Sequence, residues 1–411
     1  MQLPRDTDHH DLHAGLAPWS TTGRPRRIEL PKAHRCDVLI VGAGITGAMA
    51  AEHLTAQGHQ VTVVDREKAG LGSTAASTAM LQWEIDRSLG ELTELYGFER
   101  AADIYSHSLQ AVGGLQDLIR TLDLSCAFHT RASLYLAGGT GTGAAELKIE
   151  HELRERAGLP GFYLDHRRLL GEFGIAREAA ILSPGSAEAD PMCLSHQLLA
   201  VAAGRGANLY DGEAVAFESA KEGVAVTMTE GQTIEAGHVV LATGYVMPNL
   251  VNSELHRASS SWAIATPPQK PEALWRGNAL IWEASTPYCY ARTTHDRRII
   301  IGGEDDPALA DPDARNAALP AKVEAILGKL SALFPEVEAR ADYAWSGAFS
   351  ETGDGLPLIG RVQGHPNLYA AYGYGGNGIT FSFLAAQMIG RMIGGKDEPW
   401  FGNFALDRPK P

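Results

Sequence analysis

Hydrophobic and polar positions between residues 37 and 67 are arranged in blocks that predict a strand, a helix and a second strand. Val38 to Val41 is an unbroken apolar run, which is typical of a strand buried on both faces of a parallel sheet. Thr46 to Gln57 is predicted to be a helix, and Gly58 ends it as a glycine just past the last turn. Gln60 to Val64 then predicts the second strand. The pattern therefore predicts a βαβ unit.

Glycines and one acid occupy the ends of this unit in an arrangement that binds a dinucleotide. Gly42, Gly44 and Gly47 have the spacing that gives, in turn, a tight turn, close approach of the backbone to a pyrophosphate, and close packing of helix on strand. The N–H groups and dipole of the helix favour the pyrophosphate charge. Asp65 follows at a spacing of roughly 20 residues, where a carboxylate accepts hydrogen bonds from ribose hydroxyls. At this point both NAD and FAD remain open.

A run of small residues from Gly70 to Gln82 follows the unit directly. Small residues let backbone lie against a flat ligand, and the hydroxyl and N–H groups of this run are placed to reach phosphates or ring heteroatoms. A flexible loop is the alternative, and we favour the ligand interpretation.

Elsewhere, helical and strand patterns alternate. Residues 1–34 show no sustained periodicity and predict an irregular arm. Helices are predicted over Leu89–Leu122, Glu146–Arg156 (exposed), Leu194–Ala203, Ala321–Leu333 and Ile379–Met392. Strands are predicted over Asn208–Tyr210, Ala214–Phe217, Val224–Thr229, Thr233–Ile234, His238–Ala242 and within Trp275–Gly303, with a small β-meander before His238.

One predicted strand carries three side chains on the same face. Tyr288 and Tyr290 alternate with Cys289 and Ala291, so they point the same way, either for cross-strand packing or toward a ligand. Arg292 is one strand step further. It either contacts an anionic group of a substrate or is a surface arginine paired with a carboxylate such as Glu304 or Asp305.

Composition and charge narrow the class of protein. The 411 residues are 45% hydrophobic and 20% charged, which is enough for a large core and two lobes. The formal net charge of −14 argues against nucleic acid or an anionic membrane as a general partner. The chain has no basic-then-apolar leader and no run of about 18 apolar residues, so we expect a cytoplasmic protein without a membrane span.

Neither cysteines nor histidines predict a metal site. The cysteines are far apart and form no CxxC pair, so neither a zinc site nor a disulfide framework is indicated, and a reducing compartment fits best. His9, His10 and His13 lack acidic or cysteine partners at ligand spacing and are expected in a solvated tail.

At this point the chain resembles the D-amino-acid oxidase (DAO) superfamily of FAD-dependent oxidoreductases, which includes glycine oxidase, sarcosine oxidase and γ-glutamylputrescine oxidase. The resemblance covers nearly all of residues 36–395. It rests on five motifs in order: the βαβ unit, Gly70–Gln82, VVLATGY at Val239–Tyr245, Tyr290–Arg292 with Gly302–Gly303, and Asp354–Gly360 followed by GYGGNGI.

The resemblance implies a Rossmann-like FAD-binding domain with a βαβ unit and β-meander, and an interleaved α+β substrate domain on a mostly antiparallel sheet. After the arm, the FAD-binding domain would comprise residues 35–95, 186–250 and 340–400, and the substrate domain 96–185 and 251–339. The FAD residues would be Gly42, Gly44, Ile45, Thr46, Gly47, Asp65, Arg66, Gly72, Ser73, Thr74, Ala76, Ser77, Thr78, Leu81, Ala214, Val215, Thr243, Gly244, Gly355, Leu356, Pro357, Ile359, Gly375, Gly376, Asn377, Gly378, Ile379 and Thr380. A helix beginning near Gly378 would direct its positive end at the flavin.

Departures from the family pattern bear on attachment and substrate. Relatives with covalent FAD use a His or a Cys where this chain has Ala75, Ala76 and Ser350, so non-covalent FAD is expected. Thr380 replaces a lysine that holds the substrate carboxylate in sarcosine oxidase, and Gly376 replaces an arginine of glycine oxidase. Simple amino-acid specificity is therefore open. The oxygen-activating lysine of sarcosine oxidase aligns with Ile300, so oxidase and dehydrogenase both remain open.

The resemblance predicts oxidation of a C–N bond in a secondary amine, amino acid or amine-bearing metabolite, by hydride transfer to flavin N5. The protein's task is then orientation. Oxygen, a quinone or a protein reoxidises the flavin. Alternatives are a 2-hydroxy-acid oxidase or dehydrogenase of the same fold, a tRNA-modifying flavin domain and an NAD-dependent dehydrogenase. Candidates for the substrate face are Gln82, Tyr288, Tyr290, Arg292, Trp345 and Tyr374.

Overall fold

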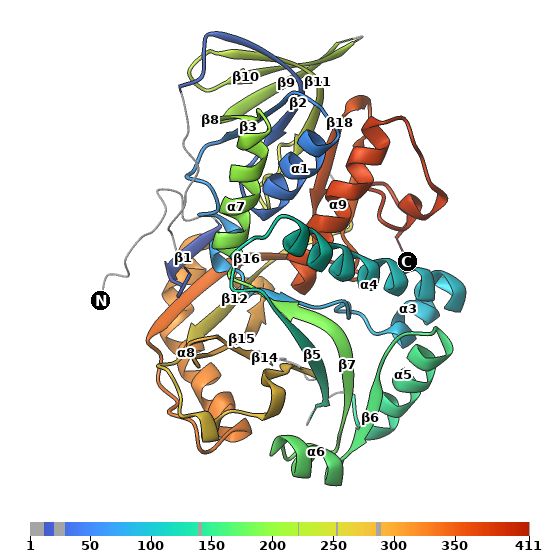
Figure 1. Ribbon diagram of the computed structural model, residues 1–411, viewed down its shortest axis with the longest axis vertical. Helices are drawn as coiled ribbons and strands as arrows, with labels where there is room; N and C mark the ends of the chain where they lie inside the picture. Colours follow the sequence, from blue (N-terminus) through green and yellow to red (C-terminus); the bar gives the residue numbers. More distant parts are fainter. Residues whose placement is uncertain are drawn as a thin grey trace.

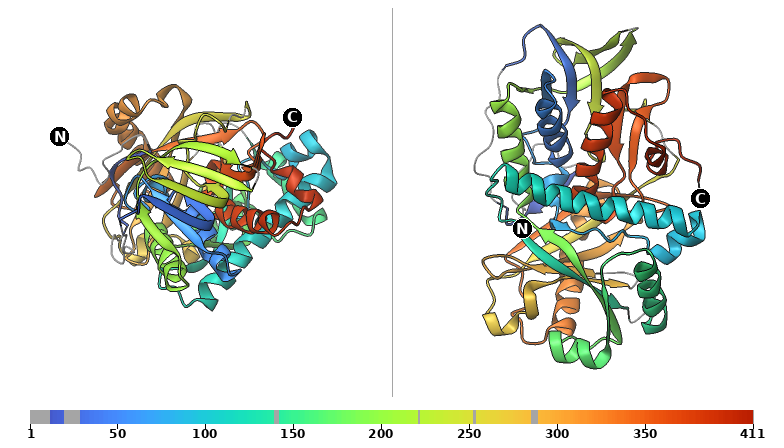
Figure 2. Two further views of the ribbon diagram at one scale, coloured as in Figure 1. Left: turned by 90° about the horizontal axis from the view of Figure 1, so that it is seen from above. Right: turned by 45° about the vertical axis from the view of Figure 1, so that its right-hand side comes forward.

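The computed structural model describes residues 12–19, 29–138, 142–220, 222–251, 254–284 and 289–410. These residues form two β-sheets in two lobes, and helix α4 (Phe98–Thr121) crosses the molecule between the lobes (Figure 1, Figure 2). One sheet is mostly parallel and the other mostly antiparallel. This architecture confirms the predicted α/β class, with a Rossmann-like unit and an α+β lobe.

The βαβ unit forms the centre of an eight-stranded sheet. Strand β2 (Ala33–Val41) pairs in parallel with β3 (Val61–Asp65) and β11 (Thr233–Leu241). Leu39 and Ile40 are fully buried, as expected of a strand covered on both faces. The other strands of this sheet are β8 (Asn208–Asp211), β9 (Ala214–Ala220), β10 (Gly223–Met228), β17 (Leu358–Val362) and β18 (His365–Tyr372).

Strand β11 corrects one sequence expectation. We expected the meander strand at Thr233–Ile234 and the sheet strand at His238–Ala242 to be separate elements. They are one strand, because β2 pairs with it from Thr233 to Leu241 while β10 pairs with its first part. The predicted meander of β9, β10 and β11 is therefore continuous with the parallel sheet.

Three helices cover the parallel sheet, and the first of them contacts the other two. Helix α1 (Ile45–Ala56) packs against α7 (Pro191–Gly204) and α9 (Gly378–Ile393) (Figure 1). Gly390 of α9 lies so close to His53 of α1 that an added Cβ would be 2.6 Å from the imidazole. This close approach brings the starts of α1 and α9 to the same end of the lobe.

The second sheet has ten strands and mostly antiparallel pairs, with β13 and β5 as the parallel pair. Its strands are β1 (His13–Leu16), β4 (Met80–Leu81), β5 (His129–Ala137), β6 (Phe162–Asp165), β7 (Ala179–Glu188), β12 (His256–Ala265), β13 (Leu280–Ala284), β14 (Cys289–Thr293), β15 (Ile299–Asp306) and β16 (Tyr343–Thr352). Around it lie α2 (Ser73–Ala76), α3 (Leu89–Tyr96), α5 (Ala144–Arg156), α6 (His166–Phe173) and α8 (Pro312–Leu333). The boundaries that we assigned to the two domains stay a prediction.

The N-terminal arm is not irregular throughout, which corrects our expectation for residues 1–34. His13–Leu16 forms β1, which pairs with β16, and Ala33 already begins β2. His13 is fully buried, so it is not part of a solvated tail. His9 and His10 lie outside the described residues.

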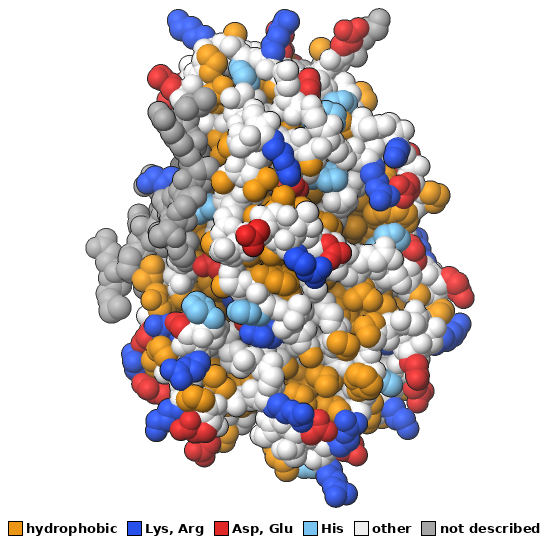
Figure 3. All heavy atoms as spheres, in the orientation of Figure 1, with side chains coloured by type: hydrophobic (Ala, Val, Ile, Leu, Met, Phe, Trp, Pro, Cys, Tyr) orange, Lys and Arg blue, Asp and Glu red, His pale blue; other side chains and the backbone are white. Residues whose placement is uncertain are grey.

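Helix α5 is also less exposed than its sequence pattern predicts. Arg154 and Glu150 are buried on its inner face, and Arg154 Nε donates to Glu150 Oε1 at 2.7 Å. On the face shown in Figure 3, acidic and basic side chains are interspersed. Among the described helices, none is long and apolar enough to cross a membrane.

Candidate functional site

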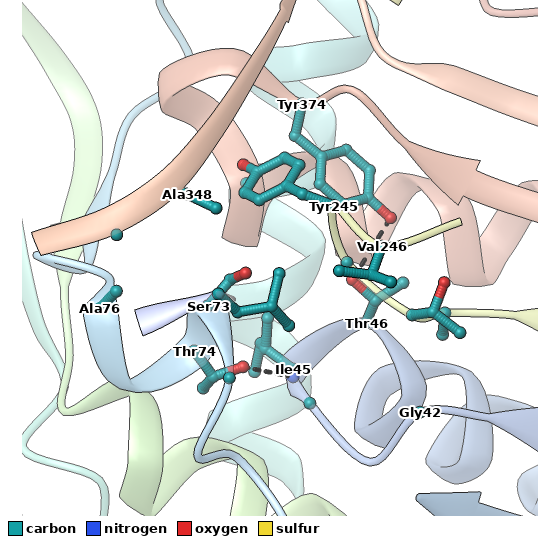
Figure 4. Close-up of a pocket in the computed structure, with 18 of the residues that line it drawn as sticks. Gly42, Ile45, Thr46, Ser73, Thr74, Ala76, Tyr245, Val246, Ala348 and Tyr374 are labelled. Atoms are coloured by element: carbon teal, nitrogen blue, oxygen red, sulfur yellow. Dashed lines mark hydrogen bonds between the residues drawn. The ribbon is translucent and has the colours of Figure 1, made fainter. Parts of the chain in front are cut away.

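A cavity of about 630 Å³ lies where the carboxyl ends of the parallel strands face the antiparallel sheet. Val41, Asp65 and Ala242 bring the ends of β2, β3 and β11 to its wall, and Tyr290 and Trp345 approach from the other sheet. Figure 4 shows residues of α1, α2 and β16 and the segments after β11 and β18 converging on this cavity. In open α/β sheets, ligands bind at this edge, and the volume is in the range of roughly 300–1,000 Å³ usual for ligand pockets.

The glycine fingerprint forms one end of the cavity. Gly42 has φ +112°, and a side chain there would collide with the main chain of Ala242. Gly47 does not line the cavity; a Cβ there would collide with the main chain of Gly42. Among the described residues, no side chain caps α1, and its first turn carries no acidic residue. The helix therefore presents its positive end, beside Ile45 and Thr46, to the cavity.

Asp65 lies at the wall beyond this helix end. Its Oδ2 accepts from Ala43 N at 2.6 Å and its Oδ1 from Glu67 N at 2.9 Å. These bonds orient the Asp65 carboxylate at the wall, the position at which a carboxylate of this fold accepts hydrogen bonds from ribose hydroxyls. Arg66 lies alongside and is 3.6 Å from Glu213.

Helix α2 supplies hydroxyl groups to the same wall (Figure 4). Thr74 Oγ1 accepts from Ile45 N at 2.9 Å, which ties α2 to the start of α1. Ser73 Oγ is buried and has no hydrogen-bond partner within the described part of the chain. A buried hydroxyl without a partner is costly, so this group fits a bound polar ligand. Together with the glycine cradle and Asp65, it fits a dinucleotide such as FAD.

The start of α9 forms the opposite wall. Gly378 and Ile379 line the cavity, and the first turn of α9 carries no acidic residue among those described. Thr46 Oγ1 on α1 is 2.7 Å from Ser382 Oγ on α9 and 3.3 Å from Tyr374 Oη. Two helix N-termini are therefore held together at one cavity, where both favour negative charge on a ligand.

Most predicted cofactor residues line this cavity. They are Gly42, Gly44, Ile45, Thr46, Asp65, Arg66, Gly72, Ser73, Thr74, Ala76, Ser77, Thr78, Ala214, Val215, Thr243, Gly244, Gly375, Gly376, Asn377, Gly378 and Ile379. Their contacts with FAD itself stay a prediction.

The other predicted cofactor residues lie behind the wall. Leu81, Leu356 and Ile359 are fully buried in the hydrophobic core. Arg408 holds the 355–359 segment from behind, because its guanidinium donates to the carbonyl oxygens of Leu356 and Pro357 at 2.7 Å. The remaining two are Gly355, which packs on Arg87, and Thr380, whose Oγ1 donates to Gln82 O at 2.8 Å.

Four of the six substrate-face candidates line the cavity: Gln82, Tyr290, Trp345 and Tyr374. Trp345 Nε1 donates to Ala76 O at 2.8 Å. The indole N–H is therefore already used, and Trp345 offers a ligand in the cavity the surface of its ring. Tyr288 lies outside the described residues.

Arg292 corrects both of our interpretations. It does not line the cavity, and it is not on the surface, because only 3% of the residue is exposed. Its Nε donates to Thr78 O at 2.6 Å, its Nη2 donates to Ala189 O at 3.0 Å, and its Nη1 is 3.2 Å from Glu188 Oε2. Arg292 therefore secures the small-residue run from behind. Its carboxylate partner is Glu188 and not Glu304, which pairs with Lys329.

Sequence reasoning missed Glu84, Asp86 and Tyr245, which line the cavity. Asp86 Oδ2 accepts from Gly376 N at 2.7 Å. Asp86 is exposed to the cavity, but desolvation by the protein around it raises its pKa to about 6. The charges of Asp305 and Glu351 contribute to the rise, although the Gly376 N–H and Arg87 lower it. Glu84 and Asp86 are acids at alternate positions shortly after the small-residue run, and this pattern is the sequence signal that would have identified the two of them.

Burial also raises the pKa of Glu84, of Tyr245 and of Tyr290. The two phenols therefore stay protonated near neutral pH.

Comparison with known proteins agrees with this geometry. In sequence, the chain is 26% identical over 372 residues to γ-glutamylputrescine oxidoreductase of Escherichia coli (strain K12), covering 88% of this chain and 84% of that protein. It is 25% identical over 401 residues to glycine oxidase of Bacillus licheniformis, and the match covers 91% of this chain and 98% of that protein. The fold is similar to the crystal structure of glycine oxidase from Geobacillus kaustophilus, with a TM-score of 0.78 and 23% sequence identity. This match covers 92% of this chain and 100% of that one.

Residues 37–392 match the DAO family of FAD dependent oxidoreductases, and this range includes both helix N-termini that meet at the cavity. The match spans far more than half of the chain. The chain therefore belongs to the DAO family and is an FAD-dependent oxidoreductase.

Proposed function

We propose that this enzyme oxidises a C–N bond of a secondary amine, an amino acid or an amine-bearing metabolite. The observation that carries the proposal is the single cavity that joins the dinucleotide cradle of α1 to the start of α9 and to a chamber lined by Gln82, Tyr290 and Tyr374. The relatives named for glycine and γ-glutamylputrescine support the same chemistry.

Bound FAD would accept a hydride at N5 and so supply the redox chemistry. The chain's residues would bind and orient the substrate. The ADP part would be held by the Gly42–Thr46 turn, Asp65 and α2, and the flavin would lie against Gly375–Ile379 at the start of α9. No side chain need remove a proton if the amine arrives neutral, because the nitrogen lone pair assists loss of hydride from carbon. Water then hydrolyses the imine product.

The decisive experiment is an anaerobic screen of amines, amino acids and 2-hydroxy acids for bleaching of the bound flavin. Release of ammonia or an amine together with a carbonyl product would identify C–N oxidation. Bleaching by hydroxy acids alone, with a keto acid as product, would replace this proposal by the alcohol-oxidising alternative. Admission of air to the reduced enzyme then separates an oxidase, which recovers its colour rapidly, from a dehydrogenase that needs a quinone or protein acceptor.

A further inference from the structure

The segment 82–86 is fastened along the start of α9 by side chains and main chain of both elements. Asn377 Nδ2 donates to Gln82 O at 3.0 Å and to Glu84 O at 2.7 Å. Gly376 N donates to Asp86 Oδ2 at 2.7 Å. These bonds place the Asp86 carboxylate at the cavity wall next to the glycines that precede α9.

Asp86 occupies the space that a side chain at residue 376 would need. A Cβ added to Gly376 would lie 2.7 Å from Asp86 Oδ1, and one added to Gly375 would collide with Oδ2. The structure therefore places a carboxylate at this wall and excludes a long basic side chain from residue 376.

Charge along the cavity wall is strongly unequal. Of the described lining residues, five are acidic (Asp65, Glu67, Glu84, Asp86, Glu213) and one, Arg66, is basic. Arg66 pairs with Glu213 at the dinucleotide end. The chamber end therefore has carboxylates and no basic side chain among its described lining residues.

Arg87, next to Asp86 in sequence, and Arg154, which is 3.8 Å from Glu84, are paired with other carboxylates. Arg87 Nη1 donates to Glu91 Oε1 at 2.7 Å. Arg154 Nε donates to Glu150 Oε1 at 2.7 Å. Asp86 is exposed to the cavity, so a substrate carboxylate there would meet a like charge, and like charges repel.

Glu84 is a second and independent sign of a ligand at this end. It lines the cavity and is only 2% exposed. Its Oε1 has no hydrogen-bond partner among the described residues, and the nearest cationic atom, Arg154 Nη1, is 3.8 Å away. A buried carboxylate oxygen in this state favours a ligand that donates hydrogen bonds.

The acids around Asp86 come from several elements. Glu304 and Asp306 of β15 pair with Lys329 and Lys322 of α8, whereas the charge of Asp305 between them acts on Asp86, as does that of Glu351 on β16. The charge of Arg87 lowers the pKa of Asp86, but this effect is smaller than that of the two acids. The chamber is thus exposed to the field of several carboxylates, which attracts cations.

We propose that Asp86 selects substrates that carry a second, cationic nitrogen and lack a carboxylate on the carbon that is oxidised. This inference rests on the proposed C–N oxidation, whose reacting nitrogen must be neutral for its lone pair to assist. The cation that pairs with Asp86 is consequently another nitrogen of the same molecule, as in a linear diamine. Glu84 provides further acceptor capacity deeper in the chamber.

The test compares four probes of similar length: putrescine, butylamine, γ-aminobutyrate and α-aminobutyrate. The rate of anaerobic flavin reduction and the dissociation constant from flavin spectral changes are measured for each with the FAD-loaded enzyme. We expect putrescine to exceed butylamine by roughly 10- to 100-fold in reduction rate per unit concentration, as for one charge-assisted hydrogen bond, and both aminobutyrates to fall below butylamine.

Asp86→Asn keeps an oxygen that can accept from Gly376 N and removes the charge. It should reduce the putrescine-to-butylamine ratio to within about threefold of one, with FAD content and melting temperature retained. The matched control is Asp117→Asn on the exposed face of α4, which should keep the wild-type ratio. A merely structural role for Asp86 would leave the ratio unchanged.

Two results would overturn the inference without affecting the proposed function: faster reduction by α-aminobutyrate than by butylamine, or an unchanged ratio in Asp86→Asn. If none of the amines reduces the flavin, the proposed C–N oxidation fails for them. In that case the dissociation constants still decide the charge selection, since tighter binding of putrescine than of butylamine, lost in Asp86→Asn, supports it and equal binding rejects it.

Discussion

The main-chain N–H of Gly376 donates a 2.7 Å hydrogen bond to the carboxylate of Asp86, which lies 290 residues earlier in the chain. This contact joins the segment that follows the small-residue run to the glycines that precede α9, at the wall of the cavity. The carboxylate is exposed where it borders the cavity, so a ligand that displaces water from it will strengthen its interactions. Its ionisation should therefore control how the enzyme responds to pH.

The first prediction concerns this ionisation. The pKa of Asp86 is raised to about 6, so the Asp86 carboxylate takes up a proton as the pH falls through 6. Putrescine and butylamine both react through a neutral nitrogen, so the effect of protonating that nitrogen cancels in the ratio of their reduction rates. This putrescine-to-butylamine ratio should decline below pH 6. Asp305→Asn removes a charge that raises the pKa of Asp86, so the decline should move to lower pH. The decline should disappear in Asp86→Asn. Profiles of the ratio, measured between pH 5 and 8 as roughly the stable range, check this; a decline that persists in Asp86→Asn belongs to another group.

Asp65→Ala should weaken FAD binding. Loss of a charge-assisted hydrogen bond to ribose costs about 1.5–3 kcal/mol, enough to release FAD on dilution. Asp65→Asn is the matched comparison, because it removes the charge and keeps one acceptor oxygen, for the N–H group of either Ala43 or Glu67. Equilibrium dialysis or fluorescence titration gives the dissociation constants. Equal FAD affinity in wild type and Asp65→Ala would remove this carboxylate from the ribose site.

Attachment of the flavin should be non-covalent. Ala75, Ala76 and Ser350 stand where related enzymes carry a linking His or Cys. Acid precipitation should therefore release all yellow colour as intact FAD into the supernatant, with mass spectrometry identifying it. Colour that stays in a washed, denatured pellet would show that another residue makes a covalent bond.

Arg292→Ala should lower the free energy of unfolding. It leaves Glu188, which is 1% exposed, with Arg131 as its ion-pair partner at 2.8 Å, and it deprives Thr78 O and Ala189 O of donors. Breaking a buried pair by removing one partner costs about 3–5 kcal/mol. Urea unfolding measures the change, and Glu188→Gln added to Arg292→Ala should recover part of it. Arg120→Ala, in an exposed pair with Asp117, should cost less than about 1 kcal/mol.

His13 should make the folded protein sensitive to acid. Burial, with a smaller effect of the Arg315 charge, lowers its pKa from 6.5 to about 4. Between these values the unfolded chain binds a proton that the folded chain does not, so stability is lost as the pH falls from 6.5 toward 4, by up to about 3 kcal/mol. His13→Leu should flatten this dependence in urea unfolding at several pH values. The exposed His295→Gln is the control, and equal pH dependence in all three proteins would contradict the assignment.

The sequence by itself determined the dinucleotide unit and the fold class. Short-range rules suffice there: the tight turn at Gly42, the helix that follows it and the acid at Asp65 all lie within one βαβ segment, where steric and hydrogen-bonding requirements act between near neighbours. The same holds for the glycine-rich start of α9.

Tertiary structure alone decided which side chains face the cavity. Strand alternation put Arg292 on the face of Tyr290, but only the packed fold shows Glu188 beside it, more than a hundred residues away. Asp86 likewise acquires its role from Gly376 on a distant helix. Periodicity specifies the direction of a side chain relative to its own backbone, whereas the partner that pairs with it or excludes water from it comes from the way separate elements pack.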